Sequence, residues 1–349
     1  MSAPLILALD AMGGDRAPEM VIQGANLARK RFPDVRFLLF GDQAKVAPVL
    51  KRFPQVESAA EIRHAPDVVT GDAKPSVALR SGRQSSMRLA IDAVQEGAAA
   101  GVVSAGNTGA LMTMSVVVLR MLAGIDRPAI GAFFPTLRGE SVMLDLGANV
   151  ACDANNLVQF AVMGEAFART VLGVAQPSIG VLNIGAEDLK GHDEVRAAAA
   201  FLREGPLAAQ FHGFVEGNDI TGGATDVVVT DGFTGNVALK TAEGTAKLYS
   251  EFLRGAFRSS LAAQIGYLLA RTAIAKVRER TDPRRYNGAM FLGLNGIVVK
   301  SHGGTDGFGF ANAIGVAVDM IANRINDRIG DELAQLAAPR ASGATAATG

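Results

Sequence analysis

The chain alternates between short apolar runs and longer segments of helical periodicity, and this alternation restricts its fold more than any other feature. The apolar runs end in glycine and small polar residues, which is typical of buried strands. They cover residues 5–9, 37–40, 101–103, 141–146, 179–184, 227–230 and 297–299. Helices are predicted at residues 18–30, 76–95, 157–172, 194–203, 236–257 and 311–328. This alternation predicts an α/β fold with a mostly parallel sheet.

The composition predicts one large globular unit. Of the 349 residues, 49% are hydrophobic and 19% are charged, so a large core can be buried. No linker rich in proline, serine or charge divides the chain. We therefore expect a single α/β unit over residues 1–335, either one continuous sheet or two interleaved lobes. Residues 336–349 are rich in small residues, and we expect a disordered tail there.

Charge and cysteine content indicate the setting in which the protein works. The chain has 34 basic and 34 acidic residues, so no overall field attracts nucleic acid, and we expect no nucleic-acid partner. Cys152 is the sole cysteine, has no basic neighbour and is expected to be structural. The first ten residues show no export signal, and we expect a cytoplasmic protein.

Two glycine-rich turns are the first candidates for an anion-binding site. Each follows a predicted strand and precedes a predicted helix, where backbone N–H groups can approach an oxyanion. The first turn supplies Asp10, Gly13, Gly14 and Asp15, and the second supplies Asn107, Thr108 and Gly109. The first can also be read as a plain tight turn, and the Asn and Thr of the second as helix caps.

Three later turns repeat the same plan. The third contributes Asn183, Lys190 and His192, the fourth contributes Asp231, Thr234 and Asn236, and the fifth contributes His302. Lys190 and His192 form the cationic pair expected near an anion, although they can also belong to a solvated loop. Loops that follow parallel strands gather at one edge of the sheet, so the five turns are expected to form one site.

Several standard motifs are absent from the sequence. The turns match neither the G-x-G-x-x-G dinucleotide pattern nor the P-loop, so a nucleotide is not indicated. The four histidines lie far apart, and no metal-binding spacing occurs. We therefore expect neither a metal nor a cofactor.

Residues 246–280 carry a different signal. Seven Lys and Arg residues flank an uncharged, partly apolar stretch at residues 259–270, which is too short to span a membrane. One interpretation is a helix pair that packs on the core or on a dimer partner. The other is a protruding segment whose apolar tip and basic flanks touch a membrane surface.

The turn sequences together resemble one protein family. The stretches LDAMGGD (9–15), AGNTGA (105–110), LDLGANV (144–150) and LNIG (182–185) occur in the order found in the PlsX family, the acyl-carrier-protein:phosphate acyltransferases of bacterial phospholipid synthesis. The resemblance continues through VEGNDI (215–220), TDGFTGN (230–236) and GLNG (293–296) and covers about residues 5–330. Arg16 and the sequence after His302 depart from many relatives, which bears on substrate contacts rather than on family.

The resemblance implies a fold, a reaction and partners. The fold would be a three-layer α/β/α unit like isopropylmalate dehydrogenase and phosphotransacetylase, usually a homodimer. The enzyme would move a long fatty acyl group from acyl carrier protein to inorganic phosphate, and the acyl phosphate would pass to a membrane glycerol-3-phosphate acyltransferase for phosphatidic acid synthesis. A peripheral position at the inner face of the cell membrane, with contact through residues 246–280, would suit this handover.

Residue roles within this reaction are hypotheses. Phosphate is a competent nucleophile and a thiolate is a good leaving group, so direct attack on the thioester needs mainly positioning and oxyanion stabilisation. We assign catalytic roles to Asn107, Lys190 and His192, and we place the remaining turn residues around the substrates. Two rival enzymes are a short-chain phosphotransacetylase that uses coenzyme A and an NAD-dependent decarboxylating dehydrogenase of the same fold. A non-catalytic protein that binds acyl chains or membranes is a third rival.

Overall fold

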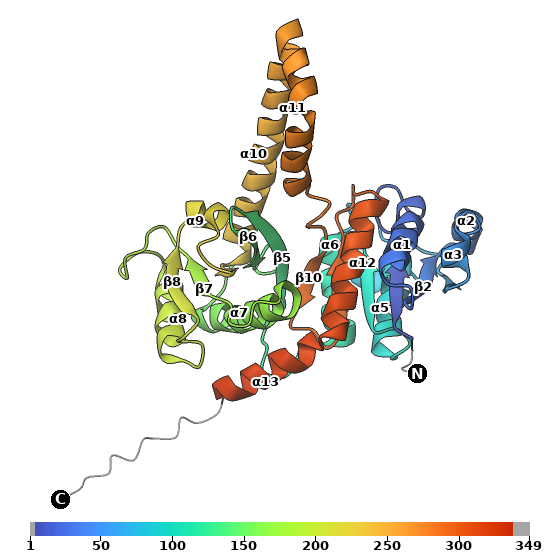
Figure 1. The fold of residues 1–349 in the computed structure, drawn as a ribbon. Coiled ribbons are helices and arrows are strands. Elements are labelled where there is room, and N and C mark those ends of the chain that lie inside the picture. The colour runs from blue at the N-terminus through green and yellow to red at the C-terminus, as the bar shows by residue number, and fades with distance from the viewer. Residues whose placement is uncertain (1–3, 338–349) are drawn as a thin grey trace, which may run out of the picture.

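The structure, a computed structural model, describes residues 4–337 and is built on one continuous sheet (Figure 1). Its eleven described strands lie in the order β3-β2-β1-β4-β11-β10-β5-β6-β9-β7-β8. The strands are β1 (Ile6–Asp10), β2 (Arg36–Gly41), β3 (Ala60–His64), β4 (Gly101–Ser104), β5 (Ala129–Thr136), β6 (Gly139–Leu144), β7 (Ile179–Leu182), β8 (Phe211–Val215), β9 (Val227–Val229), β10 (Ala289–Leu292) and β11 (Ile297–Lys300).

The sheet is mostly parallel, as predicted, but its direction reverses in the middle. Strands β3, β2, β1, β4 and β11 are mutually parallel. Strands β10 and β5 are each antiparallel to both of their neighbours. Strands β6, β9, β7 and β8 again run parallel to one another, but opposite to the first group. The carboxyl ends of the two groups therefore point to opposite edges of the sheet.

Helices cover both faces of the sheet and complete the expected three layers. One hydrophobic core includes α1, α7, α8, α12 and α13, and the other includes α4, α5, α6 and the start of α10. The helices are α1 (Glu19–Arg31), α2 (Gln43–Leu50), α3 (Pro54–Glu57), α4 (Pro75–Ser81), α5 (Ser86–Gln95), α6 (Thr108–Leu119), α7 (Ala154–Phe167), η1 (Ala168–Leu172), α8 (Asp193–Glu204), α9 (Gly217–Gly222), α10 (Gly232–Arg258), α11 (Leu261–Arg280), α12 (Gly307–Ala322) and α13 (Ile325–Ala337).

Some predicted elements need correction. The predicted helix 76–95 is two helices, because the chain turns at Gly82 and restarts at the Ser85 cap, whose side chain accepts a hydrogen bond from Arg88 N. The predicted helix 311–328 is likewise divided between α12 and α13, with Arg324 at a φ of 52°. Residues 336 and 337, assigned to a tail, belong to α13, and the rest of that expected tail lies outside the described residues.

Helices α10 and α11 form a hairpin that projects far from the sheet (Figure 1). Its helices contact each other, with the rings of Phe257 and Tyr267 5.3 Å apart near the tip. Only Gly232 and Gly235 of α10 are buried, and no residue of α11 is. The protruding segment expected at residues 246–280 is therefore present, and the interpretation that it packs on the core is wrong. Within the described chain, no helix is long and apolar enough to cross a membrane.

Two glycines of α10 provide a test of how this helix is seated. A Cβ atom at Gly235 would lie 1.9 Å from the Asp145 backbone oxygen, whereas a Cβ at Gly244 would meet nothing within 4 Å. Gly235→Ala should lower the free energy of unfolding by about 1–3 kcal/mol through overpacking. Gly244→Ala should raise it by up to about 1 kcal/mol through helix propensity. Urea denaturation followed by circular dichroism measures both, and equal effects would contradict this seating of α10.

Candidate anion-binding site

A cavity of about 670 Å³ lies at the carboxyl ends of β1, β4 and β11. Three of the five predicted turns line it, together with the loop of residues 68–71 and one residue of α10. The predicted site residues at the cavity are Gly14, Asp15, Asn107, Thr108, Gly109 and His302, and the others that line it include Met12, Thr70, Gly106, Lys240, Lys300 and Gly303. The parallel strands of the first half thus bring the first, second and fifth turns together.

Asp10 is a buried carboxylate behind this cavity rather than a group exposed within it. It ends β1, is 1% exposed, and accepts hydrogen bonds from Ser86 Oγ at 2.6 Å and Ser104 Oγ at 2.7 Å. Burial raises the pKa of Asp10, and these hydrogen bonds partly oppose that rise. A Cβ at Gly13 would lie 2.4 Å from Asp10 Oδ2, so this position needs glycine. Asp10 and Gly13 therefore hold the first and second turns together.

The second turn presents the N-terminus of α6 to the cavity. Asn107 is the helix cap, since its Oδ1 accepts a hydrogen bond from Ala110 N at 2.8 Å. Its Nδ2 donates to Gly71 O at 2.8 Å and to Ala73 O at 3.1 Å, which fixes the neighbouring loop. The Asn107 side chain is therefore fully engaged in structure. The N–H groups of Thr108 and Gly109 are in the first turn of α6, where helices leave donors for an anion.

Two lysines that the sequence reasoning missed supply positive charge. Lys300 ends β11 and Lys240 comes from α10, and both line the cavity. Burial lowers the pKa of Lys300 to about 8, with Asp10 and Asp15 opposing this fall and Lys240 adding to it. Its Nζ donates to the backbone oxygen of Ser301. Lys300 could have been predicted from the sequence, because it directly follows the apolar run at residues 297–299.

The fifth turn is joined to the first. Asp15 N donates to Gly303 O at 3.0 Å, and Arg16 Nη2 donates to Gly304 O at 3.1 Å. His302 is exposed, and its Nδ1 accepts a hydrogen bond from Gly304 N at 3.1 Å. In this arrangement the ring proton belongs on Nε2. Arg16 thus holds the fifth turn in place.

The third and fourth turns do not reach this cavity with their predicted residues. They follow β7 and β9, which run opposite to β1, β4 and β11, so the expectation that all five turns meet at one edge needs correction. Lys190 and His192 are exposed in the loop before α8, and Asn183 Nδ2 donates to Lys190 O at 3.1 Å. The loop lies apart from the cavity lining, and its catalytic role stays a prediction.

The fourth turn is a helix start that contributes indirectly. Asp231 caps α10 by accepting hydrogen bonds from Thr234 N at 2.8 Å and Thr234 Oγ1 at 2.7 Å. Asn236 Nδ2 donates to Leu146 O at 3.0 Å. These contacts fix the first turns of α10, and the same helix then places Lys240 in the cavity. The predicted residues of this turn therefore position α10.

Cys152 and possible metal ligands are the remaining candidates for chemistry outside the cavity. Burial raises the pKa of the Cys152 thiol to about 11, and the nearby Asp145 carboxylate adds to the rise. Thiolate chemistry at Cys152 near neutral pH is therefore unfavourable. Among residues 4–337, the structure places no three His, Cys, Asp or Glu side chains where they could hold a metal ion.

Comparison with solved structures agrees with the fold. A phosphotransacetylase from Streptococcus pyogenes superposes with a TM-score of 0.61 at 16% identity, covering 92% of this chain and 95% of that one. EutD phosphotransacetylase from Staphylococcus aureus gives a TM-score of 0.59 at 15% identity, covering 91% and 94%. The chain thus has a phosphotransacetylase-like α/β fold.

Sequence comparison gives the family. The model of the family described as fatty acid synthesis protein matches residues 5–328. A protein named phosphate acyltransferase from Rhodospirillum centenum is 65% identical, with 97% of this chain and 95% of that protein covered. One of the same name from Paramagnetospirillum magneticum is 64% identical, with 96% of each covered. These sequence matches define an acyltransferase. The chain belongs to the PlsX family of phosphate acyltransferases.

The engaged side chain of Asn107 leads to a prediction that separates capping from catalysis. Asn107→Ala should lower the free energy of unfolding by about 1 kcal/mol, because α6 loses its cap. Asn107→Ser keeps a capping oxygen, so it should recover most of that stability and should change acyl-transfer turnover by less than tenfold. Turnover that falls about 100-fold or more in both folded variants would instead support Asn107 as an oxyanion donor.

Proposed function

We propose that this acyltransferase transfers a long-chain fatty acyl group from acyl carrier protein to inorganic phosphate. The product, an acyl phosphate, would supply the membrane glycerol-3-phosphate acyltransferase of phosphatidic acid synthesis. The observation that carries the proposal is the cavity in which Lys240 and Lys300 accompany the N-terminus of α6. Two cations and free helix N–H groups suit a small dianion such as phosphate. The names of the relatives give the same acceptor.

The proposed chemistry is one direct displacement. A phosphate oxygen attacks the thioester carbonyl carbon, a C–O bond forms, the C–S bond breaks and the thiolate leaves. Lys300 and Lys240 hold the phosphate, and the N–H groups of Thr108 and Gly109 bind its remaining oxygens. His302 is available at the rim to orient the thioester through its Nε2 proton. No acyl-enzyme is needed, which agrees with the unfavourable thiol of Cys152.

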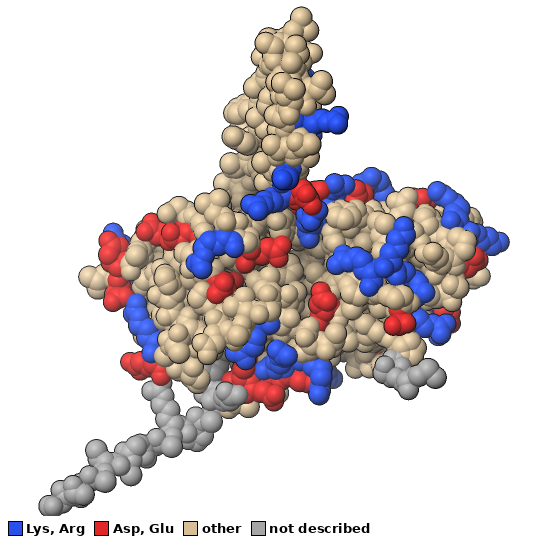
Figure 2. Space-filling view, in the orientation of Figure 1, with Lys and Arg blue, Asp and Glu red and all other residues tan. Residues whose placement is uncertain are grey.

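The α10–α11 hairpin supports a peripheral membrane contact as the finer part of this proposal. Its apolar side chains are exposed, with Leu261 at 79%, Leu268 at 61% and Leu269 at 80%. On the face shown in Figure 2 the outer part of the hairpin is nearly free of charged side chains, which gather at its base. An apolar tip with a basic residue beside it, Arg258 in the last turn of α10, fits the surface of an anionic bilayer, where an amphiphilic product would be delivered. The alternative is that these apolar side chains are buried against a second copy of the chain in a homodimer.

The reaction is tested by phosphate-dependent release of thiol from palmitoyl-acyl carrier protein, with the acyl phosphate trapped by hydroxylamine. Acetyl-coenzyme A and an NAD reduction assay are run beside it. The proposal predicts hydroxamate formation that requires phosphate and the long-chain donor. Activity only on acetyl-coenzyme A would indicate the phosphotransacetylase, and activity only with NAD would indicate the dehydrogenase.

The lowered pKa of Lys300 makes phosphate binding depend on pH. As pH rises through about 8, Lys300 loses its proton and its positive charge, so kcat/KM for phosphate should fall. Lys300→Arg keeps a charge throughout this range and should abolish that fall. Lys300→Met should lower kcat/KM for phosphate at pH 7 at least about tenfold, as expected for the loss of a buried charge-assisted contact. An unchanged pH profile in the arginine variant would remove Lys300 from the phosphate site.

The membrane contact is tested by vesicle flotation. The double variant Leu268→Glu, Leu269→Glu places charge on the apolar hairpin and should weaken partitioning to anionic vesicles at least about tenfold, since each buried leucine contributes about 1.5–3 kcal/mol. Leu189→Glu with Phe201→Glu is the matched control, because these side chains are 86% and 65% exposed in the loop before α8 and on α8, which lies away from the hairpin (Figure 1). If wild type, the hairpin variant and the control float equally and only the hairpin variant loses its dimers, the hairpin forms the homodimer interface and not a membrane contact.

A further inference from the structure

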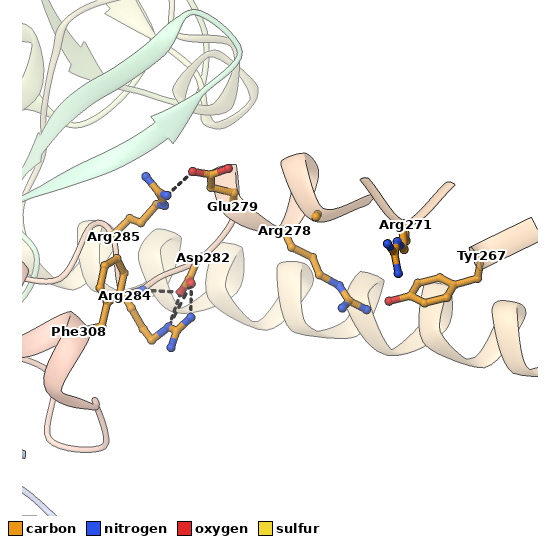
Figure 3. Close-up of a pocket in the computed structure, with 9 residues that line it drawn as sticks. Tyr267, Arg271, Arg278, Glu279, Asp282, Arg284, Arg285 and Phe308 are labelled. Carbon is orange, nitrogen blue, oxygen red and sulfur yellow. Dashed lines mark hydrogen bonds and ion pairs between the residues drawn. The ribbon is translucent and has the colours of Figure 1, made fainter. Parts of the chain in front are cut away.

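A second concave surface, outside the proposed phosphate site, runs along α11 from Tyr267 to the base of the hairpin. We call it the arginine groove: it has a volume of about 380 Å³ and is lined by Tyr267, Arg271, Ala275, Arg278, Glu279, Asp282, Arg284, Arg285 and Phe308. Figure 3 shows the labelled residues of α11 along one side of the groove and Phe308 of α12 at its end. Four arginines against two carboxylates give this surface a positive character.

The arginines of the groove differ in whether their charge is already balanced. Arg284 binds Asp282 at 2.6 Å and Asp306 at 2.7 Å, and Arg285 is paired with Glu279. Arg271 and Arg278 are exposed and make no ion pair with any residue that the structure describes. The Arg278 guanidinium lies 5.9 Å from the centre of the Tyr267 ring. Arg271 and Arg278 therefore offer two unbalanced charges on one face of α11, seven residues apart.

The arginine groove adjoins the proposed reaction cavity. Residues 302–308 form the boundary, since His302 and Gly303 line the cavity and Phe308 lines the groove. The paired Arg284 fixes this boundary, because it binds Asp306, the cap of α12, and lies 5.4 Å from the centre of the Phe308 ring. A partner that occupied the groove could extend a flexible arm past the fifth turn into the cavity.

We infer that the arginine groove docks an acidic surface of the protein that carries the acyl thioester. This inference rests on the proposed function, in which the donor is a carrier protein. Unbalanced arginines beside an aromatic ring are typical anchors for acidic protein surfaces. Docking there sets the thioester beside the cavity without placing the carrier protein inside it.

Anionic lipid is the other ligand class that two free arginines could bind. The position of the groove favours the protein. It runs along α11 from Tyr267, beside the exposed leucines of residues 261–269, to the base of the hairpin, where it ends at Phe308 of α12. Its two unpaired arginines, Arg271 and Arg278, lie between those leucines and that end. A lipid headgroup at the tip would not explain a concave surface that ends beside the reaction cavity.

The test is charge reversal of the two unpaired arginines in the full-length protein. Binding of fluorescently labelled acyl carrier protein is measured by anisotropy, and kcat/KM is measured with palmitoyl-acyl carrier protein and with palmitoyl-coenzyme A. Arg271→Glu with Arg278→Glu should weaken carrier-protein binding and raise KM for the protein donor at least about tenfold. Activity with palmitoyl-coenzyme A should stay within about twofold, because neither arginine lines the cavity. Added salt should weaken wild-type binding more than variant binding.

A control variant and three outcomes complete the experiment. Lys51→Glu with Arg63→Glu makes the same charge change after α2 and on β3, at the outer edge of the sheet, and should leave carrier-protein binding unchanged. Equal carrier-protein affinity in wild type and the groove variant would overturn the inference, as would a loss of binding to anionic vesicles without a change in that affinity. Binding that is lost in the groove variant, in an enzyme that forms no acyl phosphate from either donor, would support docking and refute the proposed reaction.

Discussion

The reversal of strand direction at β10 and β5 is the constraint on which the rest of the structure depends. Because these two strands are antiparallel to their neighbours, one continuous sheet contains two parallel groups that run in opposite directions. The turns after β1, β4 and β11 gather at one edge and enclose a cavity, while those after β7 and β9 do not. Helix α10 begins after β9, in the second group of strands, and places Lys240 in the cavity formed at the first group. Both halves of the chain therefore build the site.

The electrostatics of the cavity follow from this packing. Asp10 is held behind the turns by two serine hydroxyls, where it offsets part of the cost of burying Lys300. Lys300 keeps a pKa near 8 because burial outweighs the nearby carboxylates. A lysine with this pKa is charged at neutral pH but is poorly compensated, so an incoming dianion would be stabilised by it. The helix N-terminus of α6 adds donors without adding another buried charge.

The sequence predicts the parts of the fold that repeat a simple pattern. Seven strands rich in Val, Ile and Leu were located, and the family followed from the turn sequences between them. Strands β3, β5, β8 and β10 were missed, since β3 is largely exposed, β5 contains Pro135, β8 contains Gly213 and β10 has no β-branched residue. The direction of β10 and β5 depends on long-range pairing, which periodicity does not encode. For that reason Lys190 and His192 were grouped with turns that they do not join.

The candidate site could be predicted only where the chemistry is local. Glycine beside a strand end identified the first and second turns, and both line or support the cavity. Lys240 lies in the middle of a long helix, and its role depends on where α10 passes. The role of Asn107 also depends on contacts outside its own turn. Its side chain caps α6 and donates hydrogen bonds to the backbone oxygens of residues 71 and 73.

The central claim is that one anion binds between the two lysines and the N-terminus of α6. A crystal of the protein soaked in tungstate, a heavy analogue of phosphate, tests this through the anomalous signal of tungsten. The account predicts a peak within hydrogen-bonding distance of Lys300 Nζ and the N–H groups of Thr108 and Gly109, and its loss in Lys300→Met. A peak only in the loop of Lys190 and His192 would contradict it.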